Sequence, residues 1–428
     1  MSAPRTLLEG LYRAAVAAAH PANCLPAHLP PPPRGRLIIL AAGKAAGSMT
    51  EVAERHYLSD EELREDRLDG LAVTRRGYGR PTRIIRVIEA GHPIPDESGL
   101  AATEEVLALA RSATERDLLL ILMSGGASAN WIAPAQGLTL DDKRSVTQAL
   151  LRSGASIGEI NTVRKHLSRI KGGKLAASAQ AFLLLTLAIS DVPGDDPAVI
   201  GSGPTVPDPS TLAEAREIVA RYRLELPTAV ARALDDPANE TPKPGDPVFD
   251  PTVFQLIARP ADAFQAAAEA ARAAGYEPVL LGDRIEGEAR GVAAAHARLA
   301  FDLQEAGRRA VILSGGELTV TIRGDGRGGP NQEYALALAL ALAGRAGIAA
   351  LAADTDGTDG GGGSPDDPAG AYVEPTTGGR ARQLGLDPAA FLANNDSTGF
   401  FLPLGDLVVP GPTFTNVNDF RAILVDRP

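Results

Sequence analysis

Short, continuous runs of aliphatic residues alternate with longer Ala-rich stretches over most of the chain, which leaves few fold classes open. Each aliphatic run ends in a turn rich in glycine or acidic residues, as in RLIILAAGKAAGSM, DLLLILMSGGAS, FLLLTLAISDVPGDD, RAVILSGGELTV and IAALAADTDGTDGGGG. Continuous aliphatic runs are typical of strands covered on both faces, so the alternation predicts an α/β fold with largely parallel sheets. Ligands of such folds bind beyond the carboxyl ends of the strands, where these turns lie.

A chain of 428 residues is longer than a single hydrophobic core usually supports, which predicts two domains. The segment LDDPANETPKPGDPVFDP, residues 234–251, is rich in proline, aspartate and glycine and shows no periodicity. We therefore expect an N-terminal, Rossmann-like α/β domain over residues 1–240 and a C-terminal α/β domain over residues 250–428.

The charge balance restricts the partners. The formal net charge is −11 and no block of five basic residues occurs, so the overall field opposes nucleic acids and anionic membranes. Cys24 is the single cysteine, which excludes a disulfide within the chain and favours the cytoplasm. The N-terminal stretch TLLEGLYRAAVAAAH is predicted to be an amphipathic helix rather than a signal peptide.

The loop in TVTIRGDGRGGPNQEYALALALALA matches the pattern G-x-G-x-x-G at Gly324, Gly326 and Gly329. An alternating apolar run precedes it and a helical run follows, with Pro330 in the expected first turn of the helix. This order is that of a dinucleotide-binding loop, and Asp354 stands close to where such a fold needs an acidic residue. The same glycines could equally cradle another anion.

Two further turns follow aliphatic runs. In AAGKAAG, Gly43 lets the backbone approach an anion while Lys44 supplies a positive charge. In MSGGASANW, residues 123–131, glycines and hydroxyls could wrap a small anion. Both turns could also be purely structural.

A third stretch, NTVRKHLSRIKGGKLA at residues 161–176, concentrates basic side chains in an acidic protein. It could bind polyphosphate, although most charge runs are solvated faces. The acidic turns ISDVPGDD, AADTDGTDG and NNDSTG offer carboxylates after buried strands, which are ligands that Mg²⁺ prefers beside a nucleotide. No pair of histidines has the spacing of a zinc site.

Taken together, these stretches resemble one family, the class II glycerate kinases, which are glycerate 2-kinases with a MOFRL-type C-terminal domain. The resemblance runs in the family's order from about residue 41 to residue 420. Its stretches are AAGKAAGSM, GHPIPDESG, LLILMSGGASA, INTVRKHLSRIKGGKLA, AISDVPGDDPAVIGSGPTVPD, SGGELTVTIRGDGRGGPNQE, AADTDGTDG, NNDSTGFF and GPTFTNVNDF.

The resemblance implies two α/β domains with the active site in the cleft between them. ATP and Mg²⁺ would phosphorylate D-glycerate at its 2-hydroxyl, with Lys44 near the reacting phosphoryl group. Many relatives carry arginine at the position of Pro330, so Arg327 is the nearest remaining guanidinium in that loop.

We expect Lys44 and Arg327 to stabilise the transferring phosphoryl group. Asp191, Asp354 and Asp356 are the predicted Mg²⁺ ligands, and the aspartates, Asp191 among them, compete for the role of base. The residues predicted to contact substrate or nucleotide are Gly43, Ser124, Gly125, Gly126, Ser128, Lys171, Gly326, Gly328, Asn331 and Glu333.

Two alternatives stay open at this point. One is an NAD(P)H-dependent hydroxypyruvate reductase that uses the glycine loop for pyrophosphate. The other is a regulator that binds a sugar acid or nucleotide without turnover. The expected partners are small molecules, with neither nucleic acid nor membrane, and a homodimer is possible.

Overall fold

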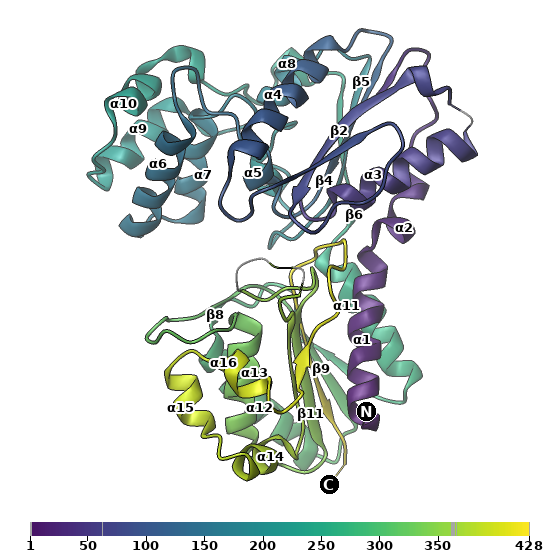
Figure 1. Ribbon diagram of the computed structural model, residues 1–428, viewed down its shortest axis with the longest axis vertical. Helices are drawn as coiled ribbons and strands as arrows, with labels where there is room; N and C mark the ends of the chain where they lie inside the picture. The colour runs from purple at the N-terminus through teal and green to yellow at the C-terminus, as the bar shows by residue number, and fades with distance from the viewer. Residues whose placement is uncertain (1, 62, 361–363, 365, 428) are drawn as a thin grey trace. The chain divides into compact units, whose positions relative to one another are not determined.

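The computed structural model describes residues 2–61, 63–360, 364 and 366–427, which fold into two compact units (Figure 1). The N-terminal unit is Cys24–Ile257, and the C-terminal unit is Met1–Asn23 together with Ala258–Pro428. This division differs from the predicted one, because the first helix belongs to the second unit and the chain changes unit at residue 258.

Helix α1 (Ala3–Ala19) joins the C-terminal unit through its apolar face. Leu8, Leu11 and Tyr12 are buried, and α1 packs along α11 (Pro260–Ala273). The Tyr12 hydroxyl donates to the carbonyl of Asp354 at 2.9 Å. The predicted amphipathic helix is confirmed, and its buried stripe explains why it lies with residues more than 200 positions away.

The N-terminal unit contains a six-stranded sheet with the order β3-β2-β1-β4-β5-β6. Its strands are β1 (Leu37–Ala42), β2 (Leu68–Arg75), β3 (Arg86–Ala90), β4 (Leu118–Met123), β5 (Leu183–Ile189) and β6 (Thr252–Ala258). Strands β3, β2, β1, β4 and β5 pair in parallel, as predicted. The order reverses between β1 and β4, and such a switch point is where doubly wound sheets bind ligands.

Helices of the N-terminal unit pack on this sheet and also form a separate group. The chain passes into this unit at the end of α2 (Pro21–Cys24). The helices of the unit are α3 (Ala46–Arg55), α4 (Glu97–Ser112), α5 (Ala127–Asn130), α6 (Leu140–Ser153), α7 (Ile157–His166), α8 (Lys174–Ser178), α9 (Leu212–Arg221) and α10 (Thr228–Asp235). Figure 1 shows α6, α7, α9 and α10 gathered beside the sheet. Their apolar side chains, including Leu150, Val163 and Ile218, form a second small core.

The C-terminal unit has a six-stranded sheet with the order β13-β12-β11-β14-β9-β7. Its strands are β7 (Glu277–Leu280), β9 (Ala310–Ser314), β11 (Ile348–Asp354), β12 (Gly370–Val373), β13 (Leu407–Val408) and β14 (Asp419–Val425), and a separate pair joins β8 (Gly287–Glu288) to β10 (Leu318–Thr319). Only β7 and β9 of the six described strands pair in parallel, while the other four pairings are antiparallel.

The prediction of a largely parallel sheet is therefore wrong for this unit, although its α/β class is confirmed. The final strand β14 returns between β9 and β11 and runs antiparallel to both. Because β11 and β14 are covered on both faces, their sequences carry the same continuous apolar pattern as parallel strands.

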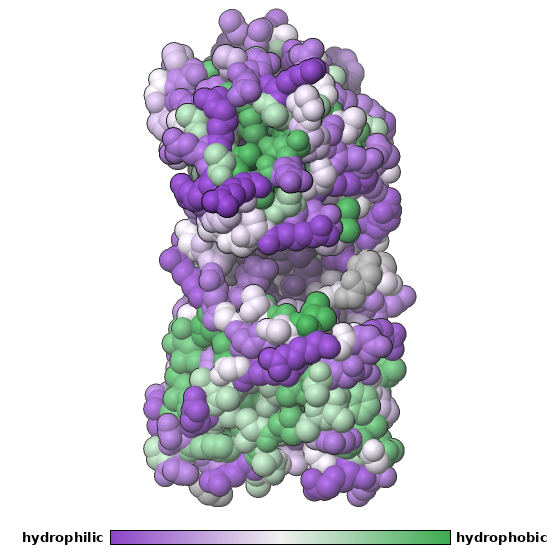
Figure 2. All heavy atoms as spheres, turned by 90° about the vertical axis from the view of Figure 1, so that its left-hand side faces the viewer, coloured by the Kyte–Doolittle hydropathy of each residue, from purple (hydrophilic) through white to green (hydrophobic). Residues whose placement is uncertain are grey.

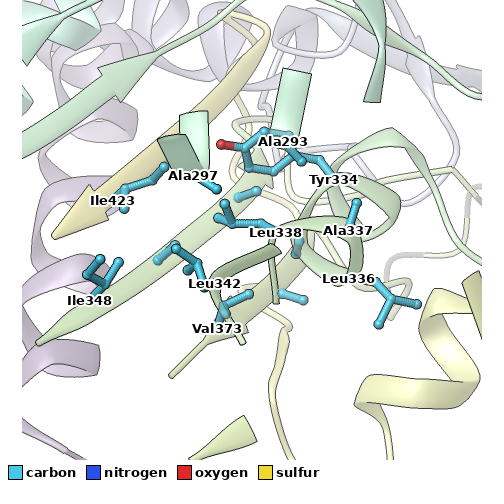
Figure 3. Packing of buried hydrophobic residues seen from close by; sticks show 14 of the residues in the cluster. Ala293, Ala297, Tyr334, Leu336, Ala337, Leu338, Leu342, Ile348, Val373 and Ile423 are labelled. Carbon is cyan, nitrogen blue, oxygen red and sulfur yellow. The ribbon is translucent and has the colours of Figure 1, made fainter. Parts of the chain in front are cut away.

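The core of the C-terminal unit is built around helix α13 (Pro330–Leu342), which starts at Pro330 as predicted. Figure 3 shows Leu338 and Leu342 of α13 facing Ile348 and Val373 of the sheet. A helix that is apolar on nearly all sides must be buried, which the ALALALAL run satisfies. The remaining helices of this unit are α12 (Ala289–Glu305), α14 (Thr377–Gln383), α15 (Pro388–Ala393) and α16 (Ser397–Phe401).

The surface mixes polar and apolar side chains. Figure 2 shows hydrophilic groups interspersed with hydrophobic ones over the drawn face. Exposed large apolar side chains such as Ile94, Phe182 and Ile322 come from different segments, which is ordinary for a folded protein. Among the helices that the structure describes, none combines the length and apolar character needed to cross a membrane.

Candidate active site

Three predicted site segments leave the sheet of the N-terminal unit at the same edge. The register aligns Ala42 of β1 with Met123 of β4, and Met123 with Ala188 of β5. Lys44, the turn 124–128 and Asp191 follow directly, so they extend from the carboxyl edge. Since the strand order reverses between β1 and β4, the first two of these segments flank the switch point.

The turns after β1 and β4 are bound to each other. Ser124 Oγ accepts the Ala45 N–H at 2.9 Å, and the Lys44 N–H donates to the carbonyl of Gly125 at 2.8 Å. Gly43 has φ +115°, and a Cβ there would lie closer than 3.0 Å to the Ser124 carbonyl and hydroxyl oxygens. Ser124, which is completely buried, therefore fixes the Lys44 turn instead of facing a ligand.

Gly126 brings Lys44 next to a histidine from a third strand. A Cβ at Gly126 would lie 2.9 Å from His92 Nε2 and 3.4 Å from Lys44 Cγ. His92 stands in the loop after β3, and both it and Lys44 are half-buried. His92 belongs to the stretch GHPIPDESG but was not among the predicted site residues. Gly126 is the sequence signal that could have indicated His92, because the close approach of the two residues leaves no room for a side chain at position 126.

Ser128, also predicted, is contacted by two cations. Its Oγ accepts from Arg164 Nη2 at 2.7 Å and from Lys171 Nζ at 3.2 Å, and lies 2.9 Å from Ser202 Oγ. Lys171 Nζ also donates to the carbonyls of Ser128 and Trp131, at 2.7 and 3.1 Å. Arg164 and Ser202 were not predicted as site residues, although Arg164 belongs to the basic stretch.

The other basic residues of that stretch form contacts within the protein that stabilise the fold. Lys165 Nζ lies 3.3 Å from Asp208 Oδ1, and Arg169 pairs with Glu104. His166 Nε2 lies 2.9 Å from Glu240 Oε1, and Lys174 donates to the carbonyls of Ser168 and Asn239. Burial lowers the pKa of Lys174 to about 8. These residues therefore do not make the exposed cationic face that a solvated charge run would give.

In the C-terminal unit, the glycine loop is packed against the turn before α16. A Cβ at Gly324, Gly326 or Gly328 would lie closer than 3.0 Å to Asn394, Asp396 or Ser397 respectively. The backbone is tied to the same turn, because the Gly326 N–H donates to the Asn394 carbonyl at 3.0 Å. The glycines are thus explained by packing within the protein.

The start of helix α13 is already occupied by an internal carboxylate. Asp359 accepts the N–H groups of Asn331 at 3.0 Å and of Gln332 at 2.8 Å. Burial, with the nearby Asp419, raises the pKa of Asp359 to about 7. A dinucleotide pyrophosphate would need these same N–H groups, so this arrangement disfavours the reductase alternative.

Two predicted ligand contacts of α13 are buried side chains with internal partners. Asn331 Nδ2 donates to Asp419 Oδ1 at 2.6 Å, and Glu333 Oε1 accepts from Arg290 Nε at 2.6 Å. Asn331 is 1% exposed and Glu333 is 2% exposed. Both residues therefore fix the glycine loop and α13 in this structure.

Arg327 is held by its backbone while its side chain is exposed. Its N–H donates to Asp396 Oδ1 at 3.1 Å, and its carbonyl accepts the Thr398 N–H at 2.9 Å. The loop thus presents the guanidinium to solvent from a fixed backbone position.

The predicted metal ligands lie at strand ends in both units. Asp354 Oδ1 accepts the Asp356 N–H at 3.0 Å, and Asp356 Oδ1 accepts the Thr358 N–H at 2.8 Å. The residues that the structure describes contain no group of three or more His, Cys, Asp or Glu side chains that could hold a metal ion. Carboxylate oxygens nonetheless suit Mg²⁺, which is commonly held by one or two carboxylates together with substrate phosphates.

The fold and this edge define a two-domain α/β protein with a glycine–lysine turn at the switch point of a doubly wound sheet. Residues 7–235 match the family described as "Domain of unknown function (DUF4147)", and residues 310–419 match the MOFRL family.

The similar proteins carry two kinds of name. The chain is 47% identical to a "Putative hydroxypyruvate reductase" of Agrobacterium vitis, over 98% of this chain and 94% of the other. It is 39% identical to the "Glycerate 2-kinase" of Pyrococcus horikoshii, over 92% of this chain and 88% of the other. The crystal structure of glycerate kinase from Thermotoga maritima matches with a TM-score of 0.85 and 36% identity, over 98% of this chain and 99% of that one. This chain belongs to the class II glycerate kinase family.

Proposed function

We propose that this protein transfers the γ-phosphoryl group of ATP to the 2-hydroxyl of D-glycerate, giving 2-phosphoglycerate and ADP. Its membership of the glycerate kinase family supports the reaction class. The observation that carries the proposal is the Lys44 turn, which the carbonyl of Gly125 and the hydroxyl of Ser124 hold at the switch point.

Phosphoryl transfer needs positioning and neutralisation of charge more than covalent chemistry by the protein. In the proposed step the 2-hydroxyl oxygen bonds to the γ-phosphorus, and the bond to the β–γ bridging oxygen breaks. The Lys44 ammonium and the Arg327 guanidinium stabilise the negative charge on the transferring group. The hydroxyl proton passes to a carboxylate, for which Asp191 at the sheet edge is our candidate.

Mg²⁺ would neutralise charge on the ATP phosphates, and Asp191, Asp354 and Asp356 are its candidate ligands. In the two glycine turns of the N-terminal unit, Gly43, Gly125 and Gly126 would let the ATP phosphates approach the backbone. Gly326 and Gly328 would act indirectly, by fixing the backbone of Arg327. The cytoplasmic location and a homodimer stay predictions.

Hydroxypyruvate reduction is the second candidate, because two Agrobacterium vitis relatives carry that name. The Asp359 carboxylate already accepts the N–H groups at the start of α13, and the loop glycines are packed against neighbouring residues. Both observations disfavour the binding of a dinucleotide at this loop. The kinase is therefore the function that we propose.

Release of ADP from ATP by the wild-type protein, measured with and without D-glycerate, tests the proposal. We expect ADP release to depend on D-glycerate and Mg²⁺, and Lys44→Ala to lower kcat by about 100- to 1000-fold. Arg221→Gln is the control, because Arg221 is an exposed residue of α9 paired with Glu159. Full turnover by Lys44→Ala would refute the lysine's role. Oxidation of NAD(P)H by hydroxypyruvate without ADP release would favour the reductase.

A further inference from the structure

Arg164 and Lys171 donate only to neutral acceptors, unlike Lys165, His166 and Arg169 of the same basic stretch. Arg164 donates to the Ser128 hydroxyl and, at 3.5 Å, to Asn161 Oδ1. Lys171 donates to two carbonyls and to the same hydroxyl. Within the described part of the chain, neither forms an ion pair, whereas Lys165, His166 and Arg169 each face a carboxylate.

Lys171 is also buried, and Arg164 is half-buried. Lys171 is 1% exposed, and Lys143, a third cation, donates its Nζ hydrogen to the Arg164 carbonyl at 2.9 Å. Burial, with the positive charges of Arg164 and Lys143, holds the pKa of Lys171 well below its ordinary value. Buried charges are costly unless an opposite charge compensates them, so a group of cations without a carboxylate is suited to an anionic ligand.

A serine hydroxyl completes the cluster. Ser128 Oγ accepts from both cations, which uses its two lone pairs, so its own hydrogen is directed to Ser202 Oγ at 2.9 Å. The Ser202 hydroxyl, 1% exposed, then keeps its own hydrogen for another acceptor. Arg164 likewise has more N–H groups than its two described acceptors use.

The backbone fixes the cluster in place. The Gly172 N–H donates to the Ser202 carbonyl at 2.9 Å, and the Gly173 N–H donates to the Gly203 carbonyl at 2.7 Å. Both glycines have positive φ, at +60° and +79°, so the turn after Lys171 is fixed against the 3-10 turn η4 (Ile200–Ser202). The Arg164 guanidinium and the Ser202 hydroxyl are thus preorganised beside Lys171, as recognition of a carboxylate requires.

We propose that Arg164 and Ser202 bind the carboxylate of the substrate, while Lys171 holds Ser128 and adds positive charge, and that this cluster thereby selects a 2-hydroxy acid over a neutral alcohol. This inference rests on the proposed function and adds the residues that would select its substrate. Ser128 is two residues beyond Gly126, which adjoins Lys44. In glycerate the 2-hydroxyl is on the carbon bonded to the carboxylate, so an anchor beside the Lys44 turn favours transfer to the 2-hydroxyl over the 3-hydroxyl.

Equilibrium dialysis of the full-length protein with labelled D-glycerate, labelled D-glyceramide and labelled ATP tests this site without requiring turnover. We expect the wild type to bind the acid at least about tenfold more tightly than the uncharged amide, because charge-assisted hydrogen bonds are lost with the charge. Arg164→Gln should raise the Kd of D-glycerate by about 10- to 100-fold and leave that of ATP within about twofold. Ser202→Ala, a smaller change that spares the fold, should raise the Kd of D-glycerate by about 3- to 10-fold. Arg221→Gln is the control and should bind all three ligands as the wild type does.

Wild-type affinity for D-glycerate in both variants would overturn the proposal. Weaker binding of ATP in place of D-glycerate would also overturn it, because the cluster would then hold a phosphate. If the wild type binds D-glycerate in the predicted way but releases no ADP, the proposed function fails while the carboxylate site stands.

Discussion

Replacing Gly326 by alanine would test whether the glycine loop is packed inside the protein or kept open for a nucleotide. The added Cβ would lie 2.4 Å from Asp396 Cβ and 2.6 Å from the Asn394 carbonyl oxygen. Ordinary contacts begin at 3.4 Å, so the turn at 394–396 would have to move by about 1.0 Å, the difference between 3.4 Å and the shortest distance of 2.4 Å. Overpacking of this kind costs about 1–3 kcal/mol. The position has no left-handed φ, so the backbone adds no strain of its own.

Calorimetric unfolding of the ligand-free protein measures this cost. For a unit of about 200 residues, 1 kcal/mol moves the Tm by about 2–4 °C, so the transition of the C-terminal unit should fall by about 2–12 °C. Gly291→Ala is the matched control, because a Cβ at this exposed position of α12 meets nothing within 4 Å. That control should raise stability by up to about 1 kcal/mol. An unchanged Tm for Gly326→Ala, with a loss of nucleotide binding, would refute the packing argument.

Two further perturbations test buried charges, one in each unit. Because the folded-state pKa of Asp359 is raised to about 7, its contribution to stability is complete below about pH 4 and is lost as the pH rises through 7. Urea unfolding should therefore show wild-type stability falling relative to Asp359→Asn by on the order of 1.4 kcal/mol per pH unit across that window, and equal slopes would contradict the reasoning. Asp208→Ala leaves the buried ammonium of Lys165 unpaired, so the N-terminal unit should lose about 3–5 kcal/mol, which the double variant with Lys165→Met should largely restore. A double variant as unstable as the single one would show that the ion pair is not the cause.

Sequence patterns predict the parallel sheet of the N-terminal unit because each strand and its following helix are local features. The runs at β1, β4 and β5 were therefore located correctly, together with the turns at their ends. The direction of β14 is not local. It depends on where the last strand inserts, and burial on both faces removes the alternation that marks many antiparallel strands.

The candidate site shows the same difference between local features, which the sequence predicts, and non-local ones, which it does not. The turns that carry Lys44 and Ser128 could be predicted because they come directly after predicted strands. The hydrogen-bond partner of each polar side chain could not be predicted from local sequence. Asp359 caps a helix that starts 29 residues earlier in the chain. Arg164 and Arg169 look alike in the basic stretch, but only Arg169 meets a carboxylate among the described residues. Such pairings depend on tertiary packing between segments far apart in sequence.

The position of the phosphate on the product tests the proposed reaction most directly. Phosphorus NMR of the acid formed from D-glycerate, ATP and Mg²⁺ by the wild-type protein distinguishes the isomers, because the phosphorus couples to the hydrogens on the carbon that carries it. A phosphate on the 2-hydroxyl couples to the single hydrogen on that carbon and gives a doublet, which is the result that we predict. A triplet, from the two hydrogens at the 3-position, would contradict transfer to the 2-hydroxyl, and the absence of any phosphorylated acid would contradict the kinase itself.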